Sequence, residues 1–201
     1  MIKIKKFAVT ITRQFGSLGR PIAKRMSELL NIEYYDRDIV DMTAKKLNLP
    51  VSEVIDNEES AKSAFFKMRY PFGSGTTQLQ DSIYLAQQRI IMDFVKHQSC
   101  IVVGRCSDYI LQNMENCINI FIYAPYEQRL RNCIEDLHLT PTEAKKMIEE
   151  VDRARDAYHK QIAGYLPNDL SSKHIMIDSS LLGVEGTAEF LADLVKRKFS
   201  D

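Results

Sequence analysis

Residues 7–23 read FAVTITRQFGSLGRPIA, which joins an apolar run, a glycine-containing turn and a helical pattern. The apolar run, Phe7–Thr12, is rich in β-branched residues and predicts a buried strand. From Arg20 to Leu30 the apolar residues have helical spacing, and Pro21 suits a first helical turn, where its missing N–H is not needed. This order of elements predicts an anion site, because free backbone N–H groups and the helix dipole favour phosphate.

The turn departs from a Walker A phosphate loop. That motif, G-x-x-x-x-G-K-[ST], needs a lysine that reaches the phosphates and a hydroxyl for Mg²⁺. Arg20 stands where the lysine would be, Pro21 cannot supply a hydroxyl, and Ser17 is the hydroxyl nearby. Arginines on both sides of the glycines can pair with phosphate, although a turn shaped for geometry alone is the alternative. The predicted phosphate-binding residues are Arg13, Gly16, Ser17, Leu18, Gly19 and Arg20.

Further strands and helices alternate along the chain. Glu33–Tyr35 is a short strand candidate, and three more apolar runs predict buried strands, at Cys100–Val103, Ile118–Tyr123 and His174–Ile177. Helical patterns occur near 38–47, 107–114, 126–137, 141–162 and 184–198, and residues 51–98 read as helical with a break at 71–75. Continuous apolar strands separated by helices predict an α/β fold with a doubly wound, five-stranded parallel sheet, in one domain over 1–201.

Composition argues against several classes of protein. The 201 residues include 27 Lys plus Arg and 27 Asp plus Glu, and this zero net charge gives no support to a nucleic-acid binder. The four cysteines form no C-x-x-C pair, so buried thiols are expected rather than disulfides or a zinc site. The first apolar run is too short for a signal peptide or a membrane span, which predicts a cytoplasmic protein without a membrane partner.

Four candidate groups for the site immediately follow predicted strands, at Arg13–Arg20, Asp36–Arg37, Gly104–Arg105 and Ala124–Pro125. Ligands of doubly wound sheets bind at the carboxyl ends of the strands, so we expect these groups to meet there. Arg105 follows a buried strand directly and is predicted to contact phosphate. Asp36 could instead cap the helix that follows it.

Several motifs resemble the cytidylate kinase-like family over nearly the whole chain. ITRQFGSLGRPIA at 11–23 and IEYYDR at 32–37 resemble its N-terminal signature, and similar segments are VVGR at 102–105, IFIYAPYEQR at 120–129, DRARDAY at 152–158 and IDSSLLGVE at 177–185. The family usually has glycine where Leu18 stands. Cytidylate kinase has an aspartate, implicated in reading cytosine, where Cys106 stands.

The resemblance implies a P-loop nucleoside-monophosphate-kinase fold, with a helical acceptor-side insertion at about 50–98 and a lid at about 138–166. It implies ATP and Mg²⁺ as cofactors and a nucleotide or phosphorylated metabolite as the partner. The implied acceptor-binding residues are Asp36, Arg37 and Arg105, and the implied catalytic residues are Arg20, Arg153 and Arg155. The two lid arginines also fit a charged helix surface with ion pairs, and Arg129 reads as a helix-surface residue.

Three functions stay open. The first is a kinase that transfers the γ-phosphate of ATP to a nucleoside monophosphate or a similar small acceptor. The second, favoured by the altered loop, is a nucleotide- or anion-binding module that does not catalyse. The third, favoured by Cys106, is a kinase for a non-nucleotide acceptor. The aromatic residues Phe65, Phe66, Tyr70 and Phe72 have the helical spacing of a core, with stacking on a base as the alternative, and no pattern predicts an oligomeric state.

Overall fold

A computed structural model describes residues 6–59 and 74–199 of the chain. The predictions for the aromatic group Phe65, Phe66, Tyr70 and Phe72 fall outside these residues. In the described part, no helix has both the length and the apolar character needed to cross a membrane.

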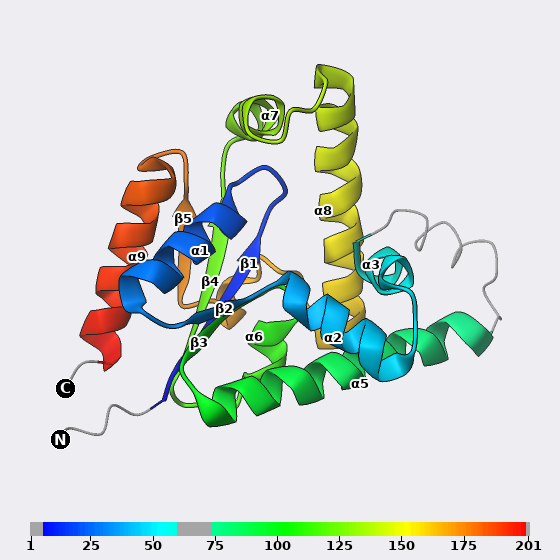
Figure 1. The fold of residues 1–201 in the computed structure, drawn as a ribbon. Coiled ribbons are helices and arrows are strands. Elements are labelled where there is room, and N and C mark those ends of the chain that lie inside the picture. The colour runs from blue at the N-terminus through cyan, green and yellow to red at the C-terminus, as the bar shows by residue number, and fades with distance from the viewer. Residues whose placement is uncertain (1–5, 60–73, 200–201) are drawn as a thin grey trace.

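Five parallel strands form one sheet in the order β2-β3-β1-β4-β5 (Figure 1). Their bounds are Ala8–Arg13 for β1, Glu33–Tyr35 for β2, Cys100–Val103 for β3, Cys117–Tyr123 for β4 and Ile175–Asp178 for β5. The strand β1 lies at the centre, in register with β3 on one side and β4 on the other. The predicted doubly wound parallel sheet is therefore confirmed, and the chain reverses direction across the sheet beside β1, where ligands of such sheets bind.

Alternate residues of each strand enter two separate cores, as the two-residue period of a strand requires. Val9 and Ile11 pack beside α1 (Gly19–Leu30) and α9 (Gly183–Phe199), which also pack against each other. Ala8 packs on the opposite face, with apolar residues of α2 (Arg37–Leu47) and α5 (Ser74–His97). Helices thus cover both faces, which explains why the strands read as continuous apolar runs.

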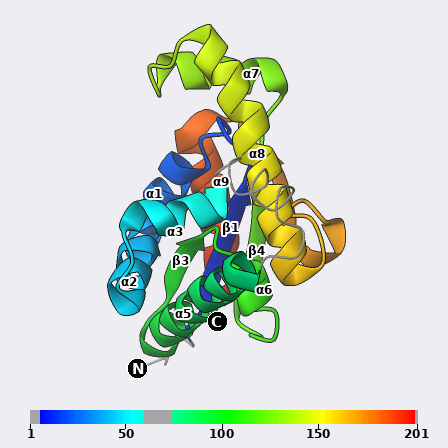
Figure 2. The ribbon, with the colours of Figure 1, turned by 90° about the vertical axis from the view of Figure 1, so that its right-hand side faces the viewer.

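Five further helices complete the described part of the chain. They are α3 (Val51–Glu59), α6 (Ser107–Ile110), α7 (Tyr126–Glu135), α8 (Pro141–Ala163) and the short helix η1 (Leu170–Ser172). The helix α8 runs between α7 and α5 (Figures 1 and 2), and it contacts α3 as well. Thr140 and Glu143 form a capping box at its start. The helix α6 is shorter than predicted, because its hydrogen bonds tighten to three-residue spacing beyond Leu111.

Candidate functional site

Three cavities meet along the carboxyl ends of β1, β2 and β3. The loop cavity, about 270 Å³, is lined by the turn after β1 together with Asp136, Leu137 and Val184. The central cavity, about 40 Å³, is lined by residues that include Thr12, Tyr158 and His159. The edge cavity, about 340 Å³, is lined by residues of α2 and α3 and by arginines.

Arginines form the walls that these cavities share. Arg13 and Arg155 line both the loop cavity and the central cavity. Arg105 lines the central and edge cavities, and Arg20 lines the loop and edge cavities. Arg37 is exposed and lines the edge cavity alone. The structure therefore brings five of the predicted arginines to one connected, strongly cationic site.

The turn after β1 presents the N-terminus of α1 to the loop cavity. Leu18 occupies the N-cap position in the left-handed conformation (φ 58°), and no side chain caps the helix. The N–H groups of the first turn therefore need an outside acceptor, as in anion sites at helix N-termini. Gly16 (φ 77°) cannot be replaced without strain, since an added Cβ would lie 2.8 Å from the Arg129 carbonyl oxygen. The left-handed geometry of Leu18 costs about 1–2 kcal/mol, which glycine would avoid.

Ser17 does not face the cavity. Its side chain is fully buried, and its Oγ lies 2.9 Å from the carbonyl oxygen of Gln14 and 3.2 Å from that of Ile122. The hydroxyl donates its hydrogen to one of these carbonyl groups, so it stabilises the turn from inside.

Asp36 lies behind the arginines rather than at the cavity surface. The residue is 3% exposed, and its carboxylate lies 2.5 Å from Arg20 Nε, 3.6 Å from Arg105 Nη2 and 4.0 Å from Arg13 Nη2. Asp36 occupies the N-cap position of α2, yet its side chain makes no capping hydrogen bond. Its Oδ1 accepts no hydrogen bond from the described residues. One carboxylate thus faces three guanidinium groups and holds them in fixed places.

A left-handed turn delivers Arg105 to the site. Gly104, Arg105 and Cys106 have φ values of 74°, 58° and 50°, so three successive residues adopt a conformation that L-residues avoid. An added Cβ at Gly104 would overlap Arg13 Nη1. Strained backbone of this kind collects at functional sites. Burial, together with the nearby charge of Arg13, lowers the pKa of Arg105 to about 10, so the guanidinium stays charged at neutral pH.

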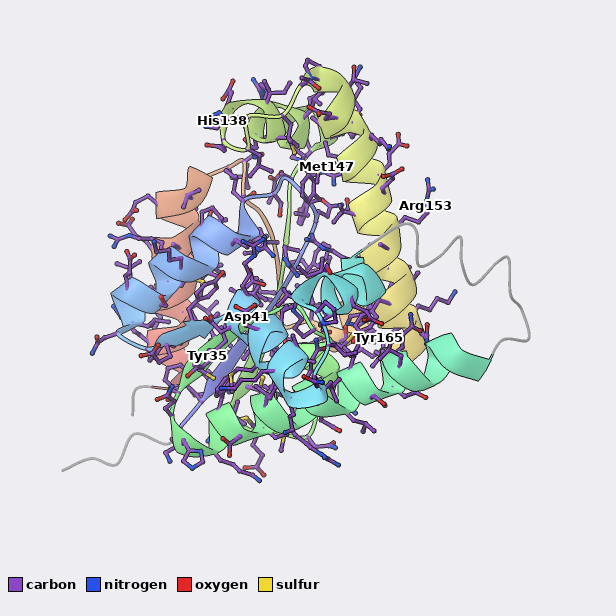
Figure 3. All side chains as sticks on the ribbon, turned by 45° about the vertical axis from the view of Figure 1, so that its right-hand side comes forward. Tyr35, Asp41, His138, Met147, Arg153 and Tyr165 are labelled. Atoms are coloured by element: carbon purple, nitrogen blue, oxygen red, sulfur yellow. The ribbon has the colours of Figure 1, made fainter. Side chains whose placement is uncertain are left out.

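The two predicted lid arginines lie differently on α8. Arg155 Nη1 donates to the Arg13 carbonyl oxygen at 3.4 Å, and its guanidinium carbon lies 6.0 Å from the centre of the Phe15 ring. Arg153 is exposed and points away from the cavities (Figure 3). Two residues span about 200° around a helix, so both side chains cannot face the loop. Of the two arginines, Arg155 lines the cavities, whereas Arg153 is exposed outside them.

Arg129 is not the surface residue that the sequence suggests. It is 9% exposed, and its Nη1 lies 2.5 Å from Asp152 Oδ2 and 3.3 Å from the Phe15 carbonyl oxygen. The carboxyl group of Asp152, in turn, contacts the turn after β1. Asn132, three residues after Arg129, also contacts the turn, through the Gly16 carbonyl oxygen. This spacing, which puts both side chains on one helix face, is the one signal in the sequence for their contact with the turn.

A second buried group of polar and charged side chains ties α8 to α6 and to the segment before β5. His159 Nε2 lies 3.0 Å from Asp108 Oδ1, His159 Nδ1 lies 2.9 Å from the Tyr165 carbonyl oxygen, and Lys173 Nζ pairs with Asp108. Burial alone would raise the pKa of Asp108, but the hydrogen bond and charge of His159 and the Lys173 ammonium outweigh it and hold this pKa below 3.8. Burial raises the pKa of the Cys106 thiol well above its usual value, so this side chain is neutral.

The described residues fit a polyphosphate better than a metal held by the protein. Uncapped N–H groups and arginines suit the anionic oxygens of ATP. For Mg²⁺, the Walker hydroxyl position is Pro21, Ser17 faces carbonyl groups, and Asp36 faces three guanidinium groups. Among residues 6–59 and 74–199, no three His, Cys, Asp or Glu side chains gather as metal ligands. The described residues therefore do not form a magnesium site of their own.

Comparison with known proteins matches residues 8–181 to the cytidylate kinase-like family. No curated protein sequence gives a significant match. Among solved structures, an uncharacterized protein from Eubacterium ventriosum ATCC 27560 is similar, with a TM-score of 0.70 and 21% identity over 98% of this chain and 99% of that chain. Shikimate kinase from Acinetobacter baumannii in complex with shikimate has a TM-score of 0.56 and 11% identity, over 98% of this chain and 97% of that chain.

Shikimate kinase from Bacteroides thetaiotaomicron is similar as well, with a TM-score of 0.58 and 9% identity over 94% of this chain and 98% of that chain. At such low identities the likeness shows a shared fold alone. The family match is more specific, since it spans residues 8–181 of 201. The chain belongs to the cytidylate kinase-like family.

Proposed function

We propose that the protein is a kinase that binds ATP and transfers its γ-phosphate to a small anionic acceptor, with a nucleoside monophosphate or another phosphorylated metabolite as the acceptor class. The observation that carries this proposal is the row of three cavities whose shared walls are arginines. A donor polyphosphate fits the loop cavity, and an anionic acceptor fits the edge cavity. Transfer between them would pass through the central cavity.

In the proposed reaction, an acceptor oxygen attacks the γ-phosphorus while the bond from this phosphorus to the β–γ bridging oxygen breaks, so that ADP leaves. Such transfers depend on positioning and on cations that neutralise the charge on the transferred group. Arg13, Arg105 and Arg155 surround the central cavity and would supply these cations. Mg²⁺ bound to ATP would add positive charge at the phosphates.

Arg20 would take the electrostatic role of the Walker lysine. Its Nε already pairs with Asp36, which orients the side chain between the loop and edge cavities. A guanidinium group is planar and always charged, and it can bind two phosphate oxygens at once. Asp36 would therefore act through the arginines that it holds rather than by touching the acceptor.

Two observations favour the other functions as second candidates. The inward-facing Ser17 hydroxyl and Pro21 leave the loop without a group for Mg²⁺, which favours a binding module without catalysis. The neutral, buried Cys106 thiol, where cytidylate kinase has its base-reading aspartate, favours an acceptor other than cytidylate.

The test is ADP formation from ATP with a panel of acceptors: the common nucleoside monophosphates, then small phosphorylated alcohols. The matched variants are Arg155→Gln and Arg153→Gln, on the same helix. Loss of Arg155 is expected to lower kcat by about 100-fold or more, while Arg153→Gln stays within about twofold. ATP binding with no ADP formed from any acceptor would support the binding module, and equal losses in both variants would sink the proposed role of Arg155.

A further inference from the structure

Side chains from two helices hold the backbone of the turn after β1. The N–H of Phe15 donates to Asp152 Oδ1 at 2.7 Å, and the carbonyl oxygen of the same residue accepts from Arg129 Nη1 at 3.3 Å. Asn132 Nδ2 donates to the next carbonyl oxygen, that of Gly16, at 2.8 Å. Both peptide groups that flank Phe15 are therefore fixed by side chains that follow them by more than one hundred residues.

The two charged members of this arrangement are also paired with each other. Arg129 Nη1 and Asp152 Oδ2 are 2.5 Å apart, and their side chains are only 11% and 23% exposed. A charge-assisted pair with little solvent around it keeps its geometry better than an exposed ion pair. We use the name Phe15 bracket for Arg129, Asp152 and the two backbone groups of Phe15 that they bind.

The turn needs such support because its own sequence does not specify its shape. Leu18 takes a left-handed conformation that disfavours leucine, and Pro21 removes one N–H from the first turn of α1. A phosphate-binding loop works only if its N–H groups point at the ligand before it arrives. In this chain, the Phe15 bracket holds the backbone of the turn in place, whereas glycine-rich loops adopt their shape through their own residues.

The bracket also fixes α8 relative to the turn. Asp152 and Arg155 are three residues apart on one face of α8. Asp152 contacts Phe15 N, and Arg155 reaches the Arg13 carbonyl oxygen and the central cavity. The contact that shapes the turn therefore also sets the place from which Arg155 enters the site.

We infer that Arg129 and Asp152 are positioning residues, which shape the turn after β1 for a polyphosphate ligand and align α8 over it. The inference rests on the proposed function, since it concerns the same site. Neither residue needs to touch the ligand. Their effect is carried by the two backbone groups of Phe15.

The test compares Asp152→Asn with Asp152→Ala, using calorimetric titration with tripolyphosphate and with ATP. Both changes remove the charge that faces Arg129, but asparagine keeps an oxygen that can accept from Phe15 N. We expect alanine to weaken binding about tenfold or more, and asparagine to stay within about threefold of wild type. Asp193→Asn, in the exposed pair with Arg197 at 2.7 Å, is the control and should leave affinity unchanged.

A charge exchange, Arg129→Asp with Asp152→Arg, separates positioning from simple tethering of α7 to α8. It can restore an ion pair but places no acceptor at Phe15 N. We expect it to recover part of the Tm lost in Asp152→Ala without recovering affinity. Recovery of both, or equal affinities in Asp152→Asn and Asp152→Ala, would overturn the inference.

A second measurement is available if these variants do not fold. The Phe15 amide in the wild-type protein should be protected from hydrogen exchange, and it should stay protected when tripolyphosphate is saturating. Loss of protection on binding would show that the ligand breaks the bracket, and the inference would fail. If the wild type binds neither ATP nor tripolyphosphate, the proposed function fails as well. If it binds them but Asp152→Ala and Asp152→Asn do not differ in affinity, only the inference fails.

Discussion

The substitution Asp36→Asn removes a negative charge that faces Arg13, Arg20 and Arg105. Asparagine has nearly the same shape and can still accept a hydrogen bond from Arg20 Nε. The substitution therefore changes charge with little change in packing. It leaves three positive charges close together, and the side chains of Arg13 and Arg105 are only 7% and 5% exposed.

The expected loss of stability follows from this burial. Removing one partner of a buried ion pair costs about 3–5 kcal/mol, because the remaining charge has no compensation. For a chain of about 200 residues, each kcal/mol shifts Tm by about 2–4 °C, so Tm should fall by roughly 6–20 °C. The matched control, Asp193→Asn, breaks an exposed pair at 2.7 Å and should cost about 0–1 kcal/mol.

The assay is thermal unfolding with and without added phosphate. Anions that bind the arginines in place of the lost carboxylate stabilise the folded state by mass action. Phosphate should therefore raise Tm more in Asp36→Asn than in the wild type, and should do little in the control. A Tm loss no larger than that of the control, or an equal phosphate effect in all three proteins, would refute the view that Asp36 organises the arginines.

Three further predictions concern the surrounding residues. Gly104→Ala and Gly164→Ala both place alanine at a positive φ, at a cost of about 1–2 kcal/mol, but only the Cβ at position 104 meets Arg13. Gly104→Ala should therefore bind tripolyphosphate more weakly than Gly164→Ala in calorimetry. Equal affinities of the two variants would contradict this. The lowered pKa of Asp108 gives stability that is present above pH 3.8 and is lost as pH falls through the pKa of the folded state. In denaturant unfolding, the free energy of unfolding of Asp108→Asn should therefore fall less steeply at acid pH than that of the wild type. An equally steep fall would count against this. Burial raises the pKa of all four buried cysteines, to about 12 for two of them; a thiol reagent at pH 8 should label none until the protein unfolds, and labelling of the native protein would be the contrary result.

Much of the fold could be predicted because the strands of this chain carry strong local signals. Cys100–Val103 is apolar throughout, since helices cover both faces of β3, and its predicted bounds are those observed. The same pattern placed Arg105 directly after a strand, and the structure puts it between two cavities. Because the carboxyl ends of parallel strands lie at one edge of the sheet, order along the chain was enough to bring these groups together.

The details of the site depend on contacts between distant residues, which local patterns do not contain. Arg129 resembles any helix-surface arginine until Asp152 and Phe15 meet it in the fold. Ser17 was a reasonable phosphate ligand by position, but its hydroxyl turns toward carbonyl groups of the sheet and the turn. Only the rotation of α8 decides that Arg155, and not Arg153, faces the cavities.

The central claim is that an arginine-walled site at the end of β1 binds the polyphosphate of ATP. The most direct measurement is a calorimetric titration of the wild-type protein with ATP, tripolyphosphate and adenosine under the same buffer conditions. The account predicts that ATP and tripolyphosphate bind and that adenosine, which has no phosphates, does not bind measurably. Binding of adenosine alone, or of none of the three, would contradict it.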